Sequence, residues 1–449
     1  MKQERLGSRL GFILLSAGCA IGIGNVWKFP YMVGQYGGGA FVLIYLLCLV
    51  LLGVPVMTME FAMGRASRKS PVRLYHELAP KGSKWHLHGY AAMAGNYILM
   101  MFYTCVSGWM LQYFVNTAAG KFAGLDTSGV AGAYKEMLAD PVELTIYMAI
   151  TVVLGFAVCA MGLQGGLERI TKVMMIVLLG IMVILAINSC FLDGGAEGLK
   201  FYLLPDLKRM ADLGVGKVIV GAMNQSFFTL SLGIGSMAIF GSYIGKERAL
   251  MGEAVNVAVL DTFVAFCSGL IIFPACFAYG VQPDSGPNLI FITLPNIFNH
   301  IPMGRLWGSL FFVFMSFAAL STVLAVFENI IACTRDLFGW SRKKACLING
   351  VLMFVLSMPC VLGFSVWSNV QINGKNIMDM EDFAVSNILL PLGALLYVLF
   401  CVTRYGWGWD NFVKEANEGK GIKVAKWMRP YCTIVIPVVI LVIFLVGIL

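Results

Sequence analysis

The chain has 449 residues, of which 59% are hydrophobic and 12% are charged, and its formal net charge is +8. Soluble domains carry about 25% charged residues, so the composition excludes a soluble protein and predicts an all-α membrane protein. The basic residues lie mainly in connections between apolar segments, so the positive charge is a signal of membrane orientation. No nucleic-acid partner is expected.

Apolar runs long enough to cross a bilayer, about 20 residues each, divide the chain into eleven expected transmembrane helices. They lie near residues 9–34, 40–63, 88–118, 144–162, 167–191, 214–243, 252–280, 306–335, 343–363, 383–403 and 430–448. The segment 281–305 is too polar and too rich in proline to span. Residues 289–294 within it are expected to form a short helix, either in an ordinary loop or in a lid.

Lys and Arg gather at the N-terminus and in every connection from an even to an odd span, as at Arg65, Arg68 and Lys69, whereas the opposite connections hold the larger share of the acids. Because basic loops stay on the cytoplasmic side, we predict a cytoplasmic N-terminus. With eleven spans the C-terminus then lies outside. The expected location is the cell membrane, with the lipid bilayer as the surrounding solvent.

Two apolar spans, the first and the sixth, each contain the sequence Gly-Ile-Gly, at residues 22–24 and 233–235. Each glycine costs about 1 kcal/mol relative to Ala in a helix, and an interruption in hydrocarbon is tolerated only where the freed backbone groups meet protein, water or a ligand. Close helix packing is the alternative reason for such glycines. Two interrupted spans in corresponding positions point to the binding site of a transporter.

A single transmembrane transporter domain over residues 1–449 follows from this correspondence. Spans one to five (9–191) and six to ten (214–403) would form two repeats, and because five is odd the second repeat enters with inverted topology. The segment 430–448 is an extra C-terminal helix.

Asp261, in the seventh span, is the clearest ionisable residue inside the membrane. A carboxylate there is costly unless it meets a cation, a positive group or a proton, and the alternative is a hydrogen bond between helices. Asn25, Thr229 and the adjacent pair Ser321 and Thr322 add oxygen atoms, which suit a hard alkali cation. No spacing among these residues selects sodium over a proton.

Five stretches carry a resemblance that runs through nearly the whole chain in order. They are Ser8 to Tyr31 (ending Gly-Ile-Gly-Asn-Val-Trp-Lys-Phe-Pro-Tyr), Tyr36 to Phe41, Pro55 to Gly64, Phe227 to Gly233 and Ile292 to Pro295. In these stretches the chain resembles the neurotransmitter:sodium symporter family, in particular its bacterial eleven-helix amino-acid transporters such as the leucine transporter. The resemblance implies a five-plus-five inverted repeat of the leucine-transporter type, with helices 1 and 6 broken.

The resemblance also implies two sodium sites. The first would use the Ala20 carbonyl with Asn25, Thr229 and Asp261. The second would use the carbonyls of Gly18, Ile21 and Ala318 with the hydroxyls of Ser321 and Thr322. Chloride-dependent members carry Asn at the position of Asp261, so the carboxylate here implies that chloride is not required.

By the same resemblance the substrate would bind where the first helix is broken. Its carboxylate would meet the backbone near Gly22, Ile23 and Gly24, and Tyr103 would donate a hydrogen bond to it. Its amine would meet carbonyls of Ala20, Phe228 and Thr229 and the side chain of Ser231 or Thr322. The side-chain pocket would be formed by Cys19, Leu99, Tyr103, Phe228, Ile234, Thr322 and Val326.

Members that carry monoamines have Asp at the position of Gly22, so glycine here implies a substrate with its own carboxylate. An outer gate is implied between Lys28 and Asp382, with Lys in place of the usual Arg. At the inner gate Tyr243 and Asp336 match, whereas Gln3 and Leu6 stand where Arg and Trp are usual, and Lys2 or Arg5 would have to supply the cation.

The function predicted from the sequence is therefore sodium-coupled symport of a hydrophobic or aromatic L-amino acid into the cell by alternating access. One alternative is a proton-coupled or exchanging amino-acid transporter of the same fold. Another, of a different class, is an ion channel or receptor without coupled transport. An enzyme is not expected, because no catalytic constellation is visible in the sequence.

Overall fold

A computed structural model of the chain describes residues 5–280 and 288–448. Helices account for nearly all of its regular structure, and six of them are short π-helical segments, labelled η. In chain order they are α1 (Arg9–Ala20), η1 (Gly24–Lys28), α2 (Phe29–Gln35), α3 (Gly39–Cys48), η2 (Leu49–Gly53), α4 (Val54–Ser67), α5 (Pro71–Leu78), α6 (His86–Ala119), α7 (Thr127–Ala139), α8 (Pro141–Ala160), η3 (Leu163–Glu168), α9 (Arg169–Cys190), α10 (Gly195–Leu203), α11 (Leu207–Leu213), α12 (Val215–Thr229), α13 (Ser236–Tyr243), α14 (Leu250–Ala278), η4 (Leu289–Thr293), α15 (Leu294–His300), α16 (Gly304–Phe338), α17 (Arg342–Leu362), α18 (Ile377–Phe383), η5 (Ala384–Leu389), α19 (Leu390–Val402), α20 (Trp409–Ala416), α21 (Met428–Pro430), η6 (Tyr431–Val435) and α22 (Ile436–Ile448).

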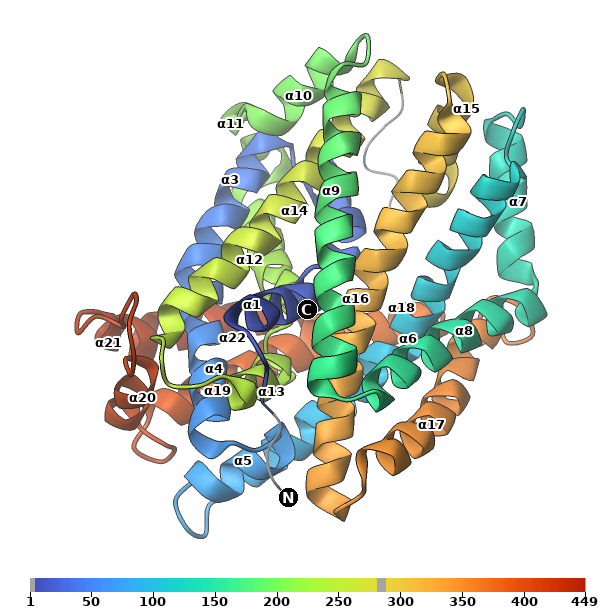
Figure 1. The fold of residues 1–449 in the computed structure, drawn as a ribbon. Helices are drawn as coiled ribbons and strands as arrows, with labels where there is room; N and C mark the ends of the chain where they lie inside the picture. The colour runs from blue at the N-terminus through green and yellow to red at the C-terminus, as the bar shows by residue number, and fades with distance from the viewer. Residues whose placement is uncertain (1–4, 281–287, 449) are drawn as a thin grey trace.

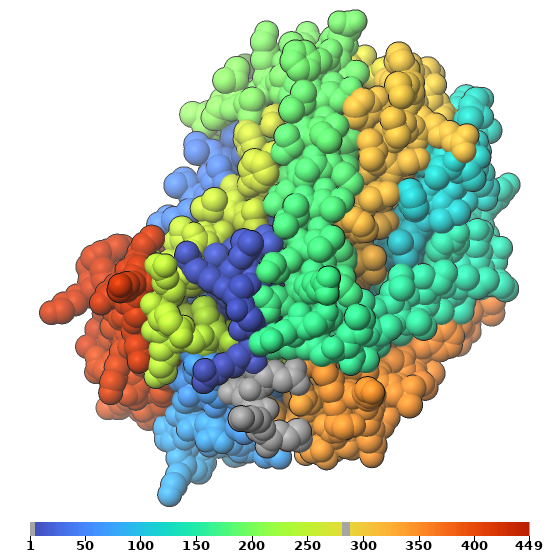
Figure 2. Space-filling model, viewed as in Figure 1, coloured from blue at the N-terminus to red at the C-terminus, as the bar shows by residue number. Residues whose placement is uncertain are grey.

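The bundle is arranged around α16, which packs against α1, α6, α8 and α9 (Figure 1). In the most apolar stretch of α16, 78% of the residues are buried. In the corresponding stretch of the C-terminal helical segment 428–448, only 28% are buried. A helix that is apolar all round and buried belongs to the core of a bundle. On the face drawn in Figure 2, α9 covers much of α16, and the short α1 lies beside α9.

Nine helices of the described chain are long and apolar enough to cross a membrane, and α1 with η1 and α2 forms a tenth candidate, bent by 54° at the break. The expected sixth span, 214–243, consists of two helices, α12 with 15 residues and α13 with 8, separated by residues 230–235. The all-α prediction is confirmed, and so are the two interruptions. The count of eleven spans is not confirmed, because neither α12 nor α13, the two halves of the expected sixth span, is long enough by itself to cross a membrane.

The two interruptions differ in their backbone. After α1 the chain turns extended at Ile21 (φ −73°, ψ 98°), and neither Gly22 nor Gly24 has a positive φ. After α12, in contrast, Ser231, Gly233 and Gly235 all have positive φ, at 50°, 98° and 78°. Only the second break therefore requires the conformational freedom of glycine.

The short helix expected at 289–294 is present as η4, and it continues into α15. It is buried near the C-terminal half of α6, where the Tyr113 hydroxyl donates a hydrogen bond of 2.9 Å to the Phe291 carbonyl. The part of the expected loop at 281–287 lies outside the described residues.

Gly233→Ala should destabilise the protein, because a Cβ at Gly233 would lie 2.2 Å from the Leu390 carbonyl oxygen at a φ of 98°. A left-handed conformation alone costs an L-residue about 1–2 kcal/mol. We expect a lower melting temperature of the detergent-purified variant, measured by thermal unfolding. The control Gly132→Ala, with nothing within 4 Å of the added Cβ, should leave it unchanged; equal melting temperatures would contradict the steric role of Gly233.

Candidate ion and substrate site

Asp261 on α14 is fully buried, and its carboxylate receives hydrogen bonds from three neighbouring segments. The Asn25 amide donates to Oδ1 at 2.8 Å, the Thr229 hydroxyl lies 3.2 Å from both oxygens, and the Tyr45 hydroxyl lies 3.5 Å from Oδ2. The residues expected at the first ion site are thus together, from η1, α12 and α14. Tyr45, on α3, is an additional partner that no sequence signal had indicated.

Ala20 is the last residue of α1, five residues before Asn25, so its carbonyl is among the last four of the helix, which have no partner within it. Asn25 connects this end to Asp261, since its amide nitrogen donates to Asp261 and its Oδ1 accepts from the Gly22 amide at 3.3 Å. The arrangement offers a carboxylate, an amide oxygen, a hydroxyl and a carbonyl. These are the oxygen ligands that hard cations bind.

A second group of oxygen atoms lies on the other side of the break, where Ser321 and Thr322 of α16 face the end of α1. The Ser321 hydroxyl lies 3.2 Å from the Ile21 carbonyl and 2.9 Å from that of Ala318. The Thr322 hydroxyl lies 3.2 to 3.4 Å from the carbonyls of Gly18, Cys19 and Ile21. A hydroxyl has one proton to donate, so acceptors outnumber donors here, and the surplus of negative potential favours a cation.

An inner cavity of about 20 Å³ lies between these two groups of oxygen atoms. Its lining contains every residue expected to contact substrate except Ile23 and Val326, and it adds Leu390: Cys19, Ala20, Gly22, Gly24, Leu99, Tyr103, Phe228, Thr229, Ser231, Ile234, Thr322 and Leu390. Ile23 lines the adjacent outer cavity. Val326 is buried in the α16 core and lines neither of the two, so the structure does not bring it to the pocket with the others.

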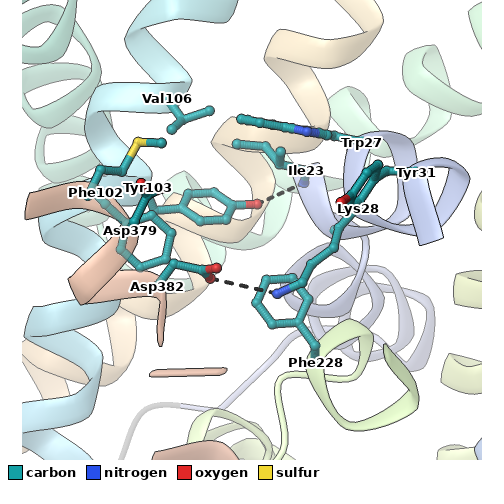
Figure 3. A pocket seen from close by; sticks show the side chains of 12 residues that line it. Ile23, Trp27, Lys28, Tyr31, Phe102, Tyr103, Val106, Phe228, Asp379 and Asp382 are labelled. Atoms are coloured by element: carbon teal, nitrogen blue, oxygen red, sulfur yellow. Dashed lines mark hydrogen bonds and ion pairs between the residues drawn. The ribbon is translucent and has the colours of Figure 1, made fainter. Parts of the chain in front are cut away.

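The outer cavity, of about 320 Å³, lies next to the inner one and is lined by Trp27, Lys28 and Asp382 among others (Figure 3). Gly24, Tyr103 and Phe228 line both cavities, and the rings of Tyr103 and Phe228 are called the partition here because they lie at the boundary between the two. The inner volume holds about one water molecule. An amino acid therefore fits the inner site only if the partition moves.

The residues expected at the outer gate meet beside this partition. The Lys28 ammonium lies 3.7 Å from Asp382 Oδ1, donates to the Ser386 hydroxyl at 3.1 Å and sits 3.8 Å from the centre of the Phe228 ring (Figure 3). Side-chain exposure is 30% for Lys28 and 42% for Asp382. The ion pair alone contributes little at that exposure, and the ring contact adds a cation–π attraction.

Gly22 and Gly24 permit close approach at the first break. A Cβ at Gly22 would lie 2.2 Å from the Tyr103 hydroxyl oxygen and 2.5 Å from that of Thr322, and one at Gly24 would lie 2.7 Å from the Phe228 ring. The Ile23 amide donates to the Tyr103 hydroxyl oxygen at 2.9 Å. That bond leaves the Tyr103 proton available to an acceptor in the cavity.

The residues expected at the inner gate have separate partners. The Tyr243 hydroxyl donates to Glu328 at 2.8 Å, and Glu328 also forms a buried ion pair with Arg342. Asp336 accepts from the backbone and the hydroxyl of Ser70, at 2.9 and 2.7 Å. Glu328 was not expected in this role from the sequence. Lys2 and Gln3 lie outside the described residues, Leu6 is half-buried against the core, and the Arg5 carbonyl accepts from the Gln164 amide.

Acidic side chains hold the N-terminal end of α1 in place. Glu168 accepts from the Gly7 amide and the Ser8 hydroxyl, both at 2.7 Å, and Arg9 forms an ion pair with Glu253 of α14 at 2.9 Å. At the second break Glu60 of α4 accepts from the Gly233 amide at 2.7 Å. Glu168 and Glu60 thus satisfy backbone amides beside a helix end and a helix break, whereas Glu253 pairs with a side chain. Their pairing depends on which helices are neighbours, which the sequence alone does not give.

Comparison with known proteins identifies relatives over the whole chain. The sequence profile of the Sodium:neurotransmitter symporter family matches residues 3–126 and 130–449. The chain is 36% identical to the uncharacterized sodium-dependent transporter YhdH of Bacillus subtilis, over 100% of this chain and 99% of that one. It is 32% identical to an uncharacterized sodium-dependent transporter of Haemophilus influenzae, over 99% and 98% of the two chains.

Among solved structures, the crystal structure of MhsT in complex with L-phenylalanine matches with a TM-score of 0.89 and 36% identity, over 99% of both chains. Fold and site together therefore define a multi-pass membrane transporter built around two interrupted helices. The chain belongs to the Sodium:neurotransmitter symporter family. Sodium-dependent transport of a small molecule is thus its activity, as the sequence predicted.

Gly22→Ala should impair transport more than folding, because the added methyl group displaces the hydroxyls of Tyr103 and Thr322. We expect sodium-dependent uptake to fall by about tenfold or more, the scale of a lost interaction worth about 1.4 kcal/mol. The matched control is Gly180→Ala, where nothing lies within 4 Å of the new Cβ. Uptake by Gly22→Ala at the level of this control would contradict the close packing at the break.

Proposed function

We propose that the protein imports a hydrophobic or aromatic L-amino acid across the cell membrane, with its N-terminus in the cytoplasm, coupled to two sodium ions through alternating access. The observation that carries the proposal is the pair of oxygen-rich groups on either side of one broken helix, with the inner cavity between them. Ions and substrate would share the same backbone segment, so that binding of one changes the surroundings of the other.

The first sodium ion would bind to the Ala20 carbonyl, Asn25, Thr229 and Asp261. The second would bind to the carbonyls of Gly18, Ile21 and Ala318 and the hydroxyls of Ser321 and Thr322. The hydrogen bonds described above support both sets. The Thr229 hydroxyl lies 3.2 Å from Asp261 at the first site, and at the second the hydroxyls of Ser321 and Thr322 lie 2.9 and 3.2 Å from the carbonyls of Ala318 and Gly18. Asp261 supplies a fixed negative charge at the first site, which supports transport without chloride.

Asn25 offers a physical route for coupling. Its Oδ1 accepts from the Gly22 amide, and the same oxygen would ligate the first sodium ion. An ion that takes this oxygen weakens its bond to the Gly22 amide, which then becomes available to the substrate carboxylate. Sodium would therefore raise substrate affinity, and substrate would raise sodium affinity by the same factor.

The substrate carboxylate would lie against Gly22, Ile23 and Gly24 and accept from the Tyr103 hydroxyl. The collision distances at Gly22 support a substrate that brings its own carboxylate, because no acidic side chain fits there. The amine would meet carbonyls near Ala20, Phe228 and Thr229 with Ser231 or Thr322. The apolar side chains of Leu99 and Ile234 and the ring of Phe228 support a hydrophobic or aromatic substrate, as does the L-phenylalanine bound to MhsT.

Alternating access would open the outer cavity when Lys28 leaves Asp382 and the Tyr103–Phe228 partition parts. On the inner side Tyr243 and Asp336 would belong to the closing contacts, with Glu328 and Arg342 as a further buried pair. A channel would need a continuous opening, and the partition between the two cavities favours a carrier instead.

The substrate proposal is tested by uptake of labelled L-phenylalanine into proteoliposomes, with each standard amino acid as competitor. We expect hydrophobic and aromatic amino acids to compete at least tenfold better than acidic or basic ones, and uptake to require an inward sodium gradient. Full uptake with potassium in place of sodium and a proton gradient would favour the proton-coupled alternative. Competition by monoamines without a carboxylate would contradict the proposed carboxylate site.

Asp261→Ala should abolish sodium-stimulated uptake, because it removes the charge of the first ion site. Wild-type uptake should be the same in chloride-free gluconate buffer as in chloride buffer. Glu143→Ala serves as the control, since this acid lies in the first turn of α8 and away from the site. Wild-type sodium dependence in Asp261→Ala would remove Asp261 from the ion site, and a strong chloride requirement of the wild type would refute chloride independence.

A further inference from the structure

A groove of about 470 Å³ runs between α8 and α17, away from the transport site. The two helices pack side by side, at the lower right of Figures 1 and 2. The buried side chains of Val152, Phe156 and Cys346 form its floor. Leu347 and Val351 stand at its rim, with exposures of 71% and 60%.

Small residues make the hollow. Ala149, Ala157 and Ala160 of α8 and Gly350 of α17 line it between the larger side chains of the floor and the rim. The floor is held from behind, because the Phe156 ring stacks on Phe327 of α16 with ring centres 4.0 Å apart and planes 15° apart. The groove is therefore a depression with a well-packed floor on the apolar outer surface of the helix bundle.

The length of the groove matches one leaflet of a bilayer. Its lining extends from residue 149 to 160 on α8 and from 343 to 354 on α17, a stretch of twelve residues, or eleven steps, along each helix. At 1.5 Å per residue this is about 16 Å, and half of the hydrocarbon core of a bilayer is about 15 Å. One acyl chain of a phospholipid has room along it.

One end of the groove carries a positive charge. Lys343, in the first turn of α17 beside the last turn of α8, is the charged residue in the lining, and it is exposed. Its neighbours point elsewhere, since Arg342 pairs with Glu328 and the Lys344 ammonium lies 5.4 Å from the centre of the Trp340 ring. Within the described part of the chain Lys343 has no ion-pair partner. This end faces the predicted cytoplasmic side, where anionic lipids attract juxtamembrane basic residues.

We propose that the groove between α8 and α17 binds one anionic glycerophospholipid of the cytoplasmic leaflet, with an acyl chain along the groove and its phosphate at the Lys343 ammonium. The apolar lining suits an acyl chain, and the length of the groove matches the thickness of one leaflet. The positive charge of Lys343 suits the negative charge of the phosphate. An ammonium donates charge-assisted hydrogen bonds to phosphate oxygens. A zwitterionic lipid gains less, because its own ammonium offsets its phosphate.

Native mass spectrometry of the purified full-length protein tests the headgroup contact, with phosphatidylglycerol and phosphatidylcholine of identical acyl chains as probes. We expect the wild type to retain one phosphatidylglycerol per chain and at least fivefold less phosphatidylcholine. Lys343→Gln should lower retention of phosphatidylglycerol at least fivefold. The matched control Lys344→Gln should retain it as the wild type does.

Ala157→Phe tests the acyl-chain contact, because position 157 is exposed and a phenyl ring there fills the groove from outside the core. The bound phosphatidylglycerol should be lost, whereas Leu154→Phe, at an exposed position of α8 outside the lining, should keep it. An unchanged melting temperature shows that each variant folds. Wild-type retention by both Lys343→Gln and Ala157→Phe would overturn the proposal. So would conversion of a dimer to a monomer by Ala157→Phe, because a second copy of the chain would then cover the groove.

Discussion

The fully buried carboxylate of Asp261 is the constraint on which the centre of the molecule depends. A charge at that depth in a membrane protein is costly unless polar groups or an ion compensate it. Its donors are Asn25, Thr229 and Tyr45, which come from three different segments. Asn25 and Thr229 can reach it because one helix stops at Ala20 and the other at Thr229. The breaks thus deliver polar groups to a place that continuous helices would leave apolar.

The two breaks achieve this by different means, although both read Gly-Ile-Gly in the sequence. At the first, glycine is required by neighbouring side chains, because Tyr103, Thr322 and the Phe228 ring occupy the space of a Cβ. At the second it is required by the backbone, which has positive φ at Gly233 and Gly235. The conformation of the first break is therefore set by the side chains around it, whereas the second is a turn set by its own backbone and by Glu60.

Much of this arrangement could be predicted from the sequence. The glycine pairs indicated both breaks, and the mid-span position of Asp261 indicated a buried charge. The family resemblance predicted that Ser321 and Thr322 lie near the end of α1, and they do. Tyr45, Glu60 and Glu328 could not be assigned in this way. Each is one polar residue in an apolar span, and its partner depends on how that span is rotated and which helix it faces, which composition and periodicity do not determine. Val326 follows Thr322 by one helical turn and does not line the inner cavity, so its contact with substrate stays a prediction.

The contacts of Lys28 have a consequence for the dependence of gating on ionic strength. Its ammonium is held by an exposed carboxylate, that of Asp382, and by a ring, that of Phe228. Dissolved salt screens the first contact, since the Debye length at 0.15 M is about 8 Å, but it affects the second less, because the ring faces a buried cavity. If the pair is the outer gate that we propose, sodium would act twice, as the coupled ion and as part of the salt that loosens the ion pair. At high salt the position of Lys28 would then depend mainly on the Ser386 hydroxyl and the Phe228 ring.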